Sequence, residues 1–107
     1  MIIDDEADYC LLMRGFFERK GYDVGVASTL QEGKERLDSW KPDILFLDNN
    51  LPDGNGWDSI ENIVEKNPQL RAYLISAHRN YSPLSNRYKN IVIWEKPISM
   101  DMLNHLF

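Results

Sequence analysis

The feature that most constrains this sequence is an uninterrupted apolar run at residues 44–47, which ends at the acidic residue Asp48. Side chains in a strand point alternately to opposite faces, so a run without polar residues predicts a strand that is buried on both faces. Residues 30–40 before this run and residues 57–64 after it carry apolar side chains at helical spacing. A buried strand between two helices is typical of a parallel sheet with helices on both faces.

The rest of the chain repeats this alternation. Thr29 and Glu32 form a capping-box pattern at the start of the second helix, and Gly21 is placed as a stop after the first. Ser99 is placed as the N-cap of a last helix. Residues 76–90 interrupt the pattern, because they hold few apolar residues and an interior proline. The predicted strands are residues 2–3, 22–26, 44–47, 72–75 and 91–94, and the helical stripes lie within residues 9–17, 30–40, 57–64 and 102–107.

Size and composition restrict the classes of protein that fit. With 107 residues and a net charge of −5, the chain is expected to be one domain, residues 1–107, that does not bind nucleic acid through its own surface. The single Cys10 excludes an internal disulfide, and no cluster of Cys and His suggests zinc. No apolar run approaches the ~18 residues of a membrane span, and the start resembles no signal peptide, so no membrane contact and a cytoplasmic location are expected.

Polar and charged residues follow the predicted strands. Asp4 and Asp5 come after the first strand, Asp48 after the third, Ser76 after the fourth and Lys96 after the fifth. In a doubly wound sheet the C-terminal ends of the strands form one edge, where ligands bind. We therefore expect these side chains to meet, although they are distant in the sequence.

The expected cluster has a definite chemistry. Two like charges about 5 Å apart repel by roughly 3 kcal/mol at an effective dielectric constant near 20. Three carboxylates together therefore favour a bound cation, and Mg²⁺ is a hard ion that prefers oxygen ligands. A carboxylate, a divalent cation, a lysine and a hydroxyl are the groups expected for phosphoryl transfer.

Four segments, IIDDE, LFLDNNLPDGNG, LISA and EKPIS, occur in an order and spacing that resembles the receiver domain of two-component response regulators. The resemblance covers the whole chain. It implies a flavodoxin-like α/β fold, which is a doubly wound, five-stranded parallel sheet of strand order 2-1-3-4-5 with helices on both faces. It also implies a signalling switch that accepts a phosphoryl group and is not an enzyme in the ordinary sense.

The resemblance implies a role for each residue of the cluster. Asp48 would accept the phosphoryl group. Mg²⁺ (or Mn²⁺) would be bound by Asp4, Asp5, Asp48 and the backbone carbonyl of Asn50, with Asp5 the more direct ligand and Asp4 acting through water. Lys96 would pair with the phosphoryl oxygens.

The resemblance also implies how the signal leaves the site. The hydroxyl of Ser76 would move to meet the phosphoryl group, and the surface formed by the fourth helix and fifth strand would change. Pro52 and Gly56 match the turn after the acceptor. Pro97 implies a cis Lys96–Pro97 peptide bond.

Some positions depart from the family pattern or leave alternatives open. The family's switch aromatic would lie three residues before Lys96, where this chain has Ile93, and Trp94 comes one residue later. One step along a strand reverses the face, so either Ile93 is a reduced switch, or Trp94 binds a partner, or Trp94 packs on neighbouring side chains. His78 and the Asn50 side chain match positions that tune dephosphorylation. The alternative for His78 is a solvent-facing loop residue.

The implied partners are a histidine kinase or phosphotransfer protein upstream, and an unidentified protein or an output domain downstream. Dimerisation through the fourth helix and fifth strand is a family habit. The open alternative is a pseudo-receiver, which has the same fold but acts as an interaction module that is never phosphorylated.

Other classes of function fit poorly. An EF-hand needs a closing glutamate where Ser59 stands. A phosphatase with an aspartate nucleophile needs an acid where Asn50 stands, and a flavin carrier needs a phosphate-binding loop where Asp4 and Asp5 stand.

Overall fold

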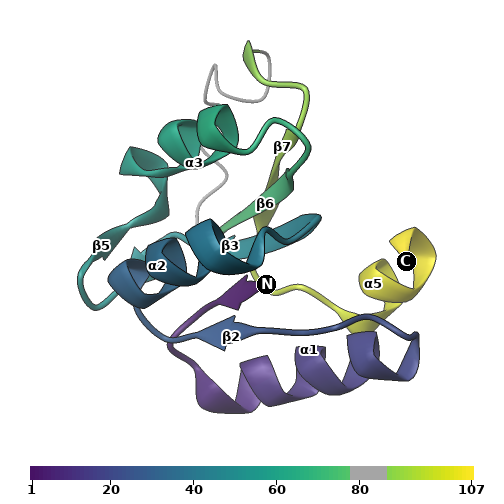
Figure 1. Cartoon of the computed structure of the whole chain (residues 1–107). Helices are drawn as coiled ribbons and strands as arrows, with labels where there is room; N and C mark the ends of the chain where they lie inside the picture. The colour runs from purple at the N-terminus through teal and green to yellow at the C-terminus, as the bar shows by residue number, and fades with distance from the viewer. Residues whose placement is uncertain (78–86) are drawn as a thin grey trace.

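The structure is a computed structural model that describes residues 1–77 and 87–107. Its centre is a five-stranded sheet with the order β2-β1-β3-β6-β7, and every neighbouring pair is parallel (Figure 1). This confirms the predicted flavodoxin-like sheet, because these strands in chain order give 2-1-3-4-5. The strands are β1 (Ile2–Ile3), β2 (Val26–Ala27), β3 (Ile44–Asp48), β6 (Arg71–Ser76) and β7 (Ile91–Glu95).

Helices cover both faces of the sheet (Figure 1). Leu45 and Leu47 of β3 belong to a core shared with α2 and α3, whereas Phe46 belongs to a core shared with α1 and α5. Full burial of such a side chain stabilises the fold by roughly 1.5–3 kcal/mol. The apolar run of β3 is therefore explained by a separate core on each of its faces. The helices are α1 (Ala7–Arg19), α2 (Leu30–Trp40), α3 (Ile60–Lys66) and α5 (Met100–Leu106).

The helix signals of the sequence are confirmed. The Thr29 hydroxyl accepts a hydrogen bond from the Glu32 N–H at 3.1 Å, and the Glu32 carboxylate accepts one from the N–H of Ser28 at 3.2 Å. Ser99 caps α5 by accepting from the Met102 N–H at 3.1 Å. Gly21 follows α1 with φ of 92°, a conformation that residues with a Cβ rarely adopt.

Two regions differ from the predictions. β2 is shorter than predicted because it lies at the edge of the sheet and its neighbour β1 spans Ile2–Ile3, so residues 22–24 have no strand beside them. The loop after β3 contains an unpredicted antiparallel hairpin and a 3-10 helix, η1, which places Trp57 before α3. These elements are β4 (Asn50–Leu51), β5 (Gly54–Asn55) and η1 (Gly56–Asp58).

Trp94 is half-buried and packs against neighbouring aromatic side chains. Its ring centroid lies 4.7 Å from that of Tyr73 and 6.0 Å from that of Phe46. Ile93 packs against the core on the opposite face of the sheet. The alternative in which Trp94 packs on neighbouring side chains is therefore the one that the structure supports.

Some expectations fall on residues that the structure does not describe. His78 and most of the irregular segment between the fourth and fifth predicted strands lie there. Among the helices of the described part, none has the length and apolar character to cross a membrane.

Candidate functional site

Three carboxylates gather at the C-terminal edge of the sheet. Asp48 is the last residue of β3, and Asp4 directly follows β1, the parallel neighbour of β3. The Asp4 N–H donates to the carbonyl of Ala27 in β2 at 3.0 Å, which fixes the backbone beyond the end of β1. Oxygen atoms of Asp4, Asp5 and Asp48 all lie within 4.8 Å of one another. The sheet therefore brings together the three acids that the sequence placed at strand ends.

Burial makes the ionised form of Asp4 unfavourable. Asp4 and Asp48 are only 4% and 2% exposed, whereas Asp5 is exposed. Burial raises the pKa of Asp4 to about 6 and the charge of Asp48 adds to the rise, although a hydrogen bond from the Glu6 N–H at 2.9 Å opposes it. A cation among these oxygens would favour the ionised form. The donor set is all oxygen and includes an exposed carboxylate, so it fits a hard ion such as Mg²⁺.

Lys96 supplies a positive charge on the other side of Asp48. Its Nζ lies 3.0 Å from Asp48 Oδ1 and 3.9 Å from Glu6 Oε1. Burial lowers the pKa of Lys96, but the hydrogen bond and charge of Asp48 outweigh burial and the pKa is raised overall. The ammonium is therefore protonated at neutral pH. Lys96 follows β7, and the bond to Pro97 is cis, the isomer that the resemblance implies.

Ser76 lies at the same edge of the sheet. It is the last residue of β6 and is buried, and its carbonyl accepts a hydrogen bond from the Lys96 N–H at 2.8 Å. The backbone of Ser76 is thereby joined to the segment that carries Lys96.

The turn after Asp48 is held close to it. The Asn50 N–H lies 3.4 Å from Asp48 Oδ1, and Pro52 is in the exposed turn of the hairpin. Gly56 is buried, and a Cβ there would lie 2.7 Å from Leu74 Cδ1 and 3.2 Å from the Asp48 carbonyl oxygen. A glycine is required at that position for the chain to pass so near Asp48.

Sequence reasoning missed Asn49 and Asp53. The side chain of Asn49 accepts from the Trp57 N–H at 3.0 Å, and its carbonyl accepts from the Gly56 N–H at 3.0 Å, which closes the base of the hairpin. The preference of Asn for capping and turns is a signal that could have indicated this role. Asp53 accepts from backbone N–H groups of α2 that are 22 and 23 residues away in sequence, so no local pattern indicates it.

A cavity of about 210 Å³ opens beside Lys96. The hydroxyl oxygen of Tyr9, one of the residues that line it, is buried and has no hydrogen-bond partner among the described residues. Burial raises the pKa of Tyr9 to about 12, so it is a neutral phenol at physiological pH. The lining residues are Asp4, Glu6, Tyr9, Lys96, Pro97 and Ile98.

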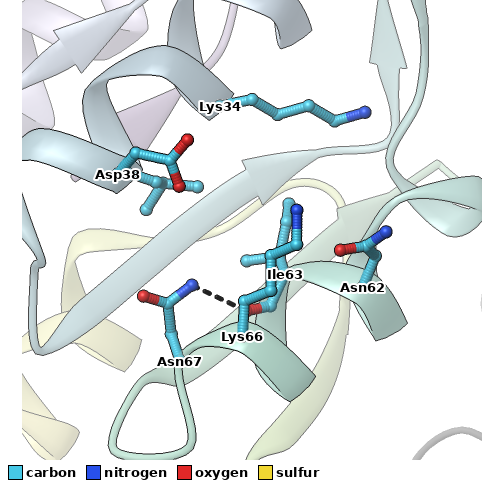
Figure 2. Close-up of a pocket in the computed structure, with 7 residues that line it drawn as sticks. Lys34, Asp38, Asn62, Ile63, Lys66 and Asn67 are labelled. Atoms are coloured by element: carbon cyan, nitrogen blue, oxygen red, sulfur yellow. Dashed lines mark hydrogen bonds between the residues drawn. The ribbon is translucent and has the colours of Figure 1, made fainter.

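A separate hollow of about 110 Å³ lies between α2 and α3. Figure 2 shows Lys34 and Asp38 of α2 facing Asn62 and Lys66 of α3 across it. None of the predicted site residues lines this hollow. The candidate site is therefore the strand edge around Asp48.

Comparisons with known proteins agree with this geometry. The family model described as "Response regulator receiver domain" matches residues 1–104. The chemotaxis protein CheY of Thermotoga maritima is 32% identical over 78 residues, which are 72% of this chain and 65% of CheY. The chain thus spans just under two thirds of the length of this relative.

Solved structures show the same fold. A two-component response regulator from Clostridium difficile matches with a TM-score of 0.84 at 25% identity, covering 98% of this chain and 88% of that one. The beryllofluoride-activated NtrC4 receiver domain dimer matches with a TM-score of 0.80 at 26% identity, covering 94% and 85% of the two chains. This chain belongs to the family of response regulator receiver domains of two-component signalling systems.

Proposed function

We propose that residues 1–107 form a receiver domain in which Asp48 accepts a phosphoryl group from a histidine kinase or a phosphotransfer protein. The observation that carries the proposal is the surroundings of Asp48. This buried carboxylate lies within the acidic cluster and, on another side, 3.0 Å from the Lys96 ammonium. A cation held by the acidic cluster would balance negative charge on one side of Asp48, and the Lys96 ammonium balances it on the other.

The proposed transfer is an in-line displacement. A carboxylate oxygen of Asp48 attacks phosphorus and forms a P–O bond, while the P–N bond to the donor imidazole breaks and its electron pair stays on nitrogen. Mg²⁺ or Mn²⁺, held by Asp4, Asp5, Asp48 and the Asn50 carbonyl, would supply positive charge to the phosphoryl oxygens. Lys96 pairs with those oxygens once they arrive.

The phosphorylated Asp48 side chain starts the signal. An acyl phosphate carries nearly two negative charges, and the Ser76 hydroxyl donates a hydrogen bond to it. That contact draws the segment after β6 toward the site and changes the surface around the fourth helix and β7. A coupling of about 1–3 kcal/mol is typical of such switches.

The proposed partners follow from this mechanism. They are the kinase or phosphotransfer protein and a downstream protein or output domain, in the cytoplasm. The acidic net charge of −5 supports the absence of direct nucleic-acid binding by this domain. The NtrC4 receiver domain forms a dimer in its beryllofluoride-activated form, which supports a homodimer as one output of phosphorylation.

The test is phosphorylation by acetyl phosphate, a small phosphodonor, with Mg²⁺ present. We expect intact-mass spectrometry to show one added phosphoryl group, which is absent without Mg²⁺ and absent in Asp48→Asn. Persistent lack of an adduct with the donor and with kinases would favour the pseudo-receiver alternative. An adduct that survives in Asp48→Asn would place the acceptor elsewhere.

A further inference from the structure

The hairpin after Asp48 is too short to be stable without contacts to the rest of the protein. β4 and β5 form two residue pairs, Asn50 with Asn55 and Leu51 with Gly54. Even a complete two-stranded hairpin is marginally stable in water. Leu51 packs partly against the core, but Asn50 is exposed. Contacts with the rest of the protein must therefore fix where the backbone of Asn50 lies.

The base of the hairpin is fixed by Asn49, whose side chain and carbonyl accept hydrogen bonds from Trp57 and Gly56 at 3.0 Å each. The tip of the hairpin needs a second attachment, because Asn50 lies between the base and the tip. Without it the strand pair could pivot about its base.

Asp53 provides the second attachment. It lies in the turn between β4 and β5, and its Oδ1 accepts from the Leu30 N–H at 2.8 Å while its Oδ2 accepts from the Gln31 N–H at 2.9 Å. Both carboxylate oxygens are thus used on the first turn of α2, whose free N–H groups favour a negative charge. These hydrogen bonds, with Gln31 first, lower the pKa of Asp53.

The contact between the turn and α2 is also steric. Gly54 has φ of 155°, and a Cβ on it would lie 3.2 Å from Leu30 Cδ2. β5 and the start of α2 lie side by side in Figure 1. The hairpin tip therefore rests directly on the first residue of α2.

We propose that Asp53 is a positioning residue for the metal site. By clamping the hairpin tip to α2, it holds the Asn50 carbonyl where the cation of the proposed function requires it. Ligands must be placed within about 0.5 Å for a functional site, and orienting partners of metal ligands typically contribute 10–100-fold to affinity. The inference rests on the proposed function, because it presupposes the divalent cation among Asp4, Asp5 and Asp48.

The experiment measures Mg²⁺ affinity by isothermal titration calorimetry and Mn²⁺ affinity by electron paramagnetic resonance on the unphosphorylated protein. We expect Asp53→Ala to weaken both by about tenfold. Asp53→Asn keeps one acceptor oxygen for one N–H, so its affinity should lie between those of Asp53→Ala and the wild type. Asp53→Asn also serves as the test if Asp53→Ala does not fold.

Two matched controls separate positioning from other effects. Thr29→Ala removes the other side-chain cap of α2 but leaves the hairpin contact, and Asp58→Asn removes an exposed acid of η1. Both should bind Mg²⁺ within about twofold of the wild type, as expected of independent sites. As a second measurement, hydrogen exchange at the Leu30 and Gln31 amides should slow when Mg²⁺ binds the wild type and should not respond in Asp53→Ala.

The possible failures can be told apart. Wild-type affinity in Asp53→Ala, or in Asp53→Asn where that is the variant that folds, overturns the inference alone. An equal loss in Thr29→Ala or Asp58→Asn also overturns it, because helix stability or net charge would then explain the effect. Absence of Mg²⁺ and Mn²⁺ binding by the wild type overturns both this inference and the metal site of the proposed function.

Discussion

At the scale of single residues, the site brings together carboxylates whose like charges repel each other. Asp4 and Asp48 are buried close to each other; burial opposes the ionisation of Asp4, and the charge of Asp48 adds to this effect. The Lys96 ammonium offsets part of the negative charge of Asp48, but the pKa of Asp4 still rises to about 6. The metal-free protein is therefore expected to be less stable than a protein with a neutral residue in place of Asp4.

We predict that Asp4→Asn stabilises the metal-free protein at neutral pH. The pKa of Asp4 is about 6 in the folded state and 3.8 in a model peptide, so the folded state binds the proton more tightly. The free energy of unfolding should consequently fall as pH rises from about 4 to about 6. With solvent screening allowed for, the gain in Asp4→Asn should be about 1–2 kcal/mol above this window.

Urea unfolding in a chelator, at about pH 7.5 and about pH 4, measures this prediction. The advantage of Asp4→Asn should be present at the higher pH and should largely vanish at the lower one, where Asp4 is protonated in the folded state and about half protonated in the unfolded state. Asp5→Asn, at the exposed acid of the cluster, is the matched control and should gain less. An equal advantage of Asp4→Asn at both pH values would contradict the ionisation argument.

A second prediction concerns Lys96. Lys96→Ala removes the ammonium 3.0 Å from Asp48 but leaves the acidic cluster, so the variant should still accept some phosphoryl group. It should lose the part of the conformational response that passes through the ammonium, because Lys96 is the residue that would link the phosphoryl oxygens to the segment after β7. Intact mass measures the first effect, and tryptophan fluorescence after phosphorylation measures the second. Lys89→Ala, at an exposed lysine, should respond as the wild type does. An unchanged fluorescence response in Lys96→Ala would refute the assigned role.

At the scale of elements, close packing between helices and sheet outweighs helix propensity. α1 and α2 each contain an interior glycine, Gly15 and Gly33. A Cβ on Gly15 would meet just the flexible Arg19 side chain at 3.2 Å, whereas one on Gly33 would lie 2.3 Å from Cδ1 of the buried Ile3. The same change to alanine should therefore have opposite effects in the two helices.

We predict that Gly15→Ala raises the free energy of unfolding by about 0.5–1 kcal/mol, because alanine is the better helix former. Gly33→Ala should lower it by about 1–3 kcal/mol, because Ile3 must leave its rotamer or α2 must move away from β1. Urea midpoints of the two variants measure the difference. Stabilisation by both changes would show that α2 does not approach β1 this closely.

The elements also show what the sequence could predict. The parallel sheet with helices on both faces followed from the alternation of strands and helices, and its strand order followed from the resemblance to receiver domains. The caps at Thr29 and Ser99 followed from local preferences that tertiary contacts did not override. The hairpin of residues 50–55 was missed because its stability comes from Asp53 and Asn49, whose partners lie outside the hairpin. Local sequence patterns thus predicted the features that local interactions determine, and they missed the hairpin, which depends on distant contacts.

At the scale of the whole molecule, the sheet separates two unlike cores. The face toward α1 and α5 is aromatic, with Phe46 stacked on Tyr73 at 5.0 Å and Trp94 beside them, and the face toward α2 and α3 is aliphatic. The carboxylates lie at the sheet edge where both cores end. A ligand bound there contacts segments that follow both β1 and β3, so its binding energy should appear in the stability of the whole domain.

We therefore predict that Mg²⁺ stabilises the domain as a unit. A ligand that binds the folded state alone adds about 2.7 kcal/mol at 100 times its dissociation constant. For a domain of this size the melting temperature should rise by about 10 °C, and a chelator should reverse the change. Asp48→Asn and Asp5→Asn should shift less, because each removes a charged ligand. Monovalent salt at matched ionic strength is the control, since screening alone would relieve repulsion among the carboxylates. If it raised the melting temperature as much as Mg²⁺ does, the acids would be a repulsive cluster and not a metal site.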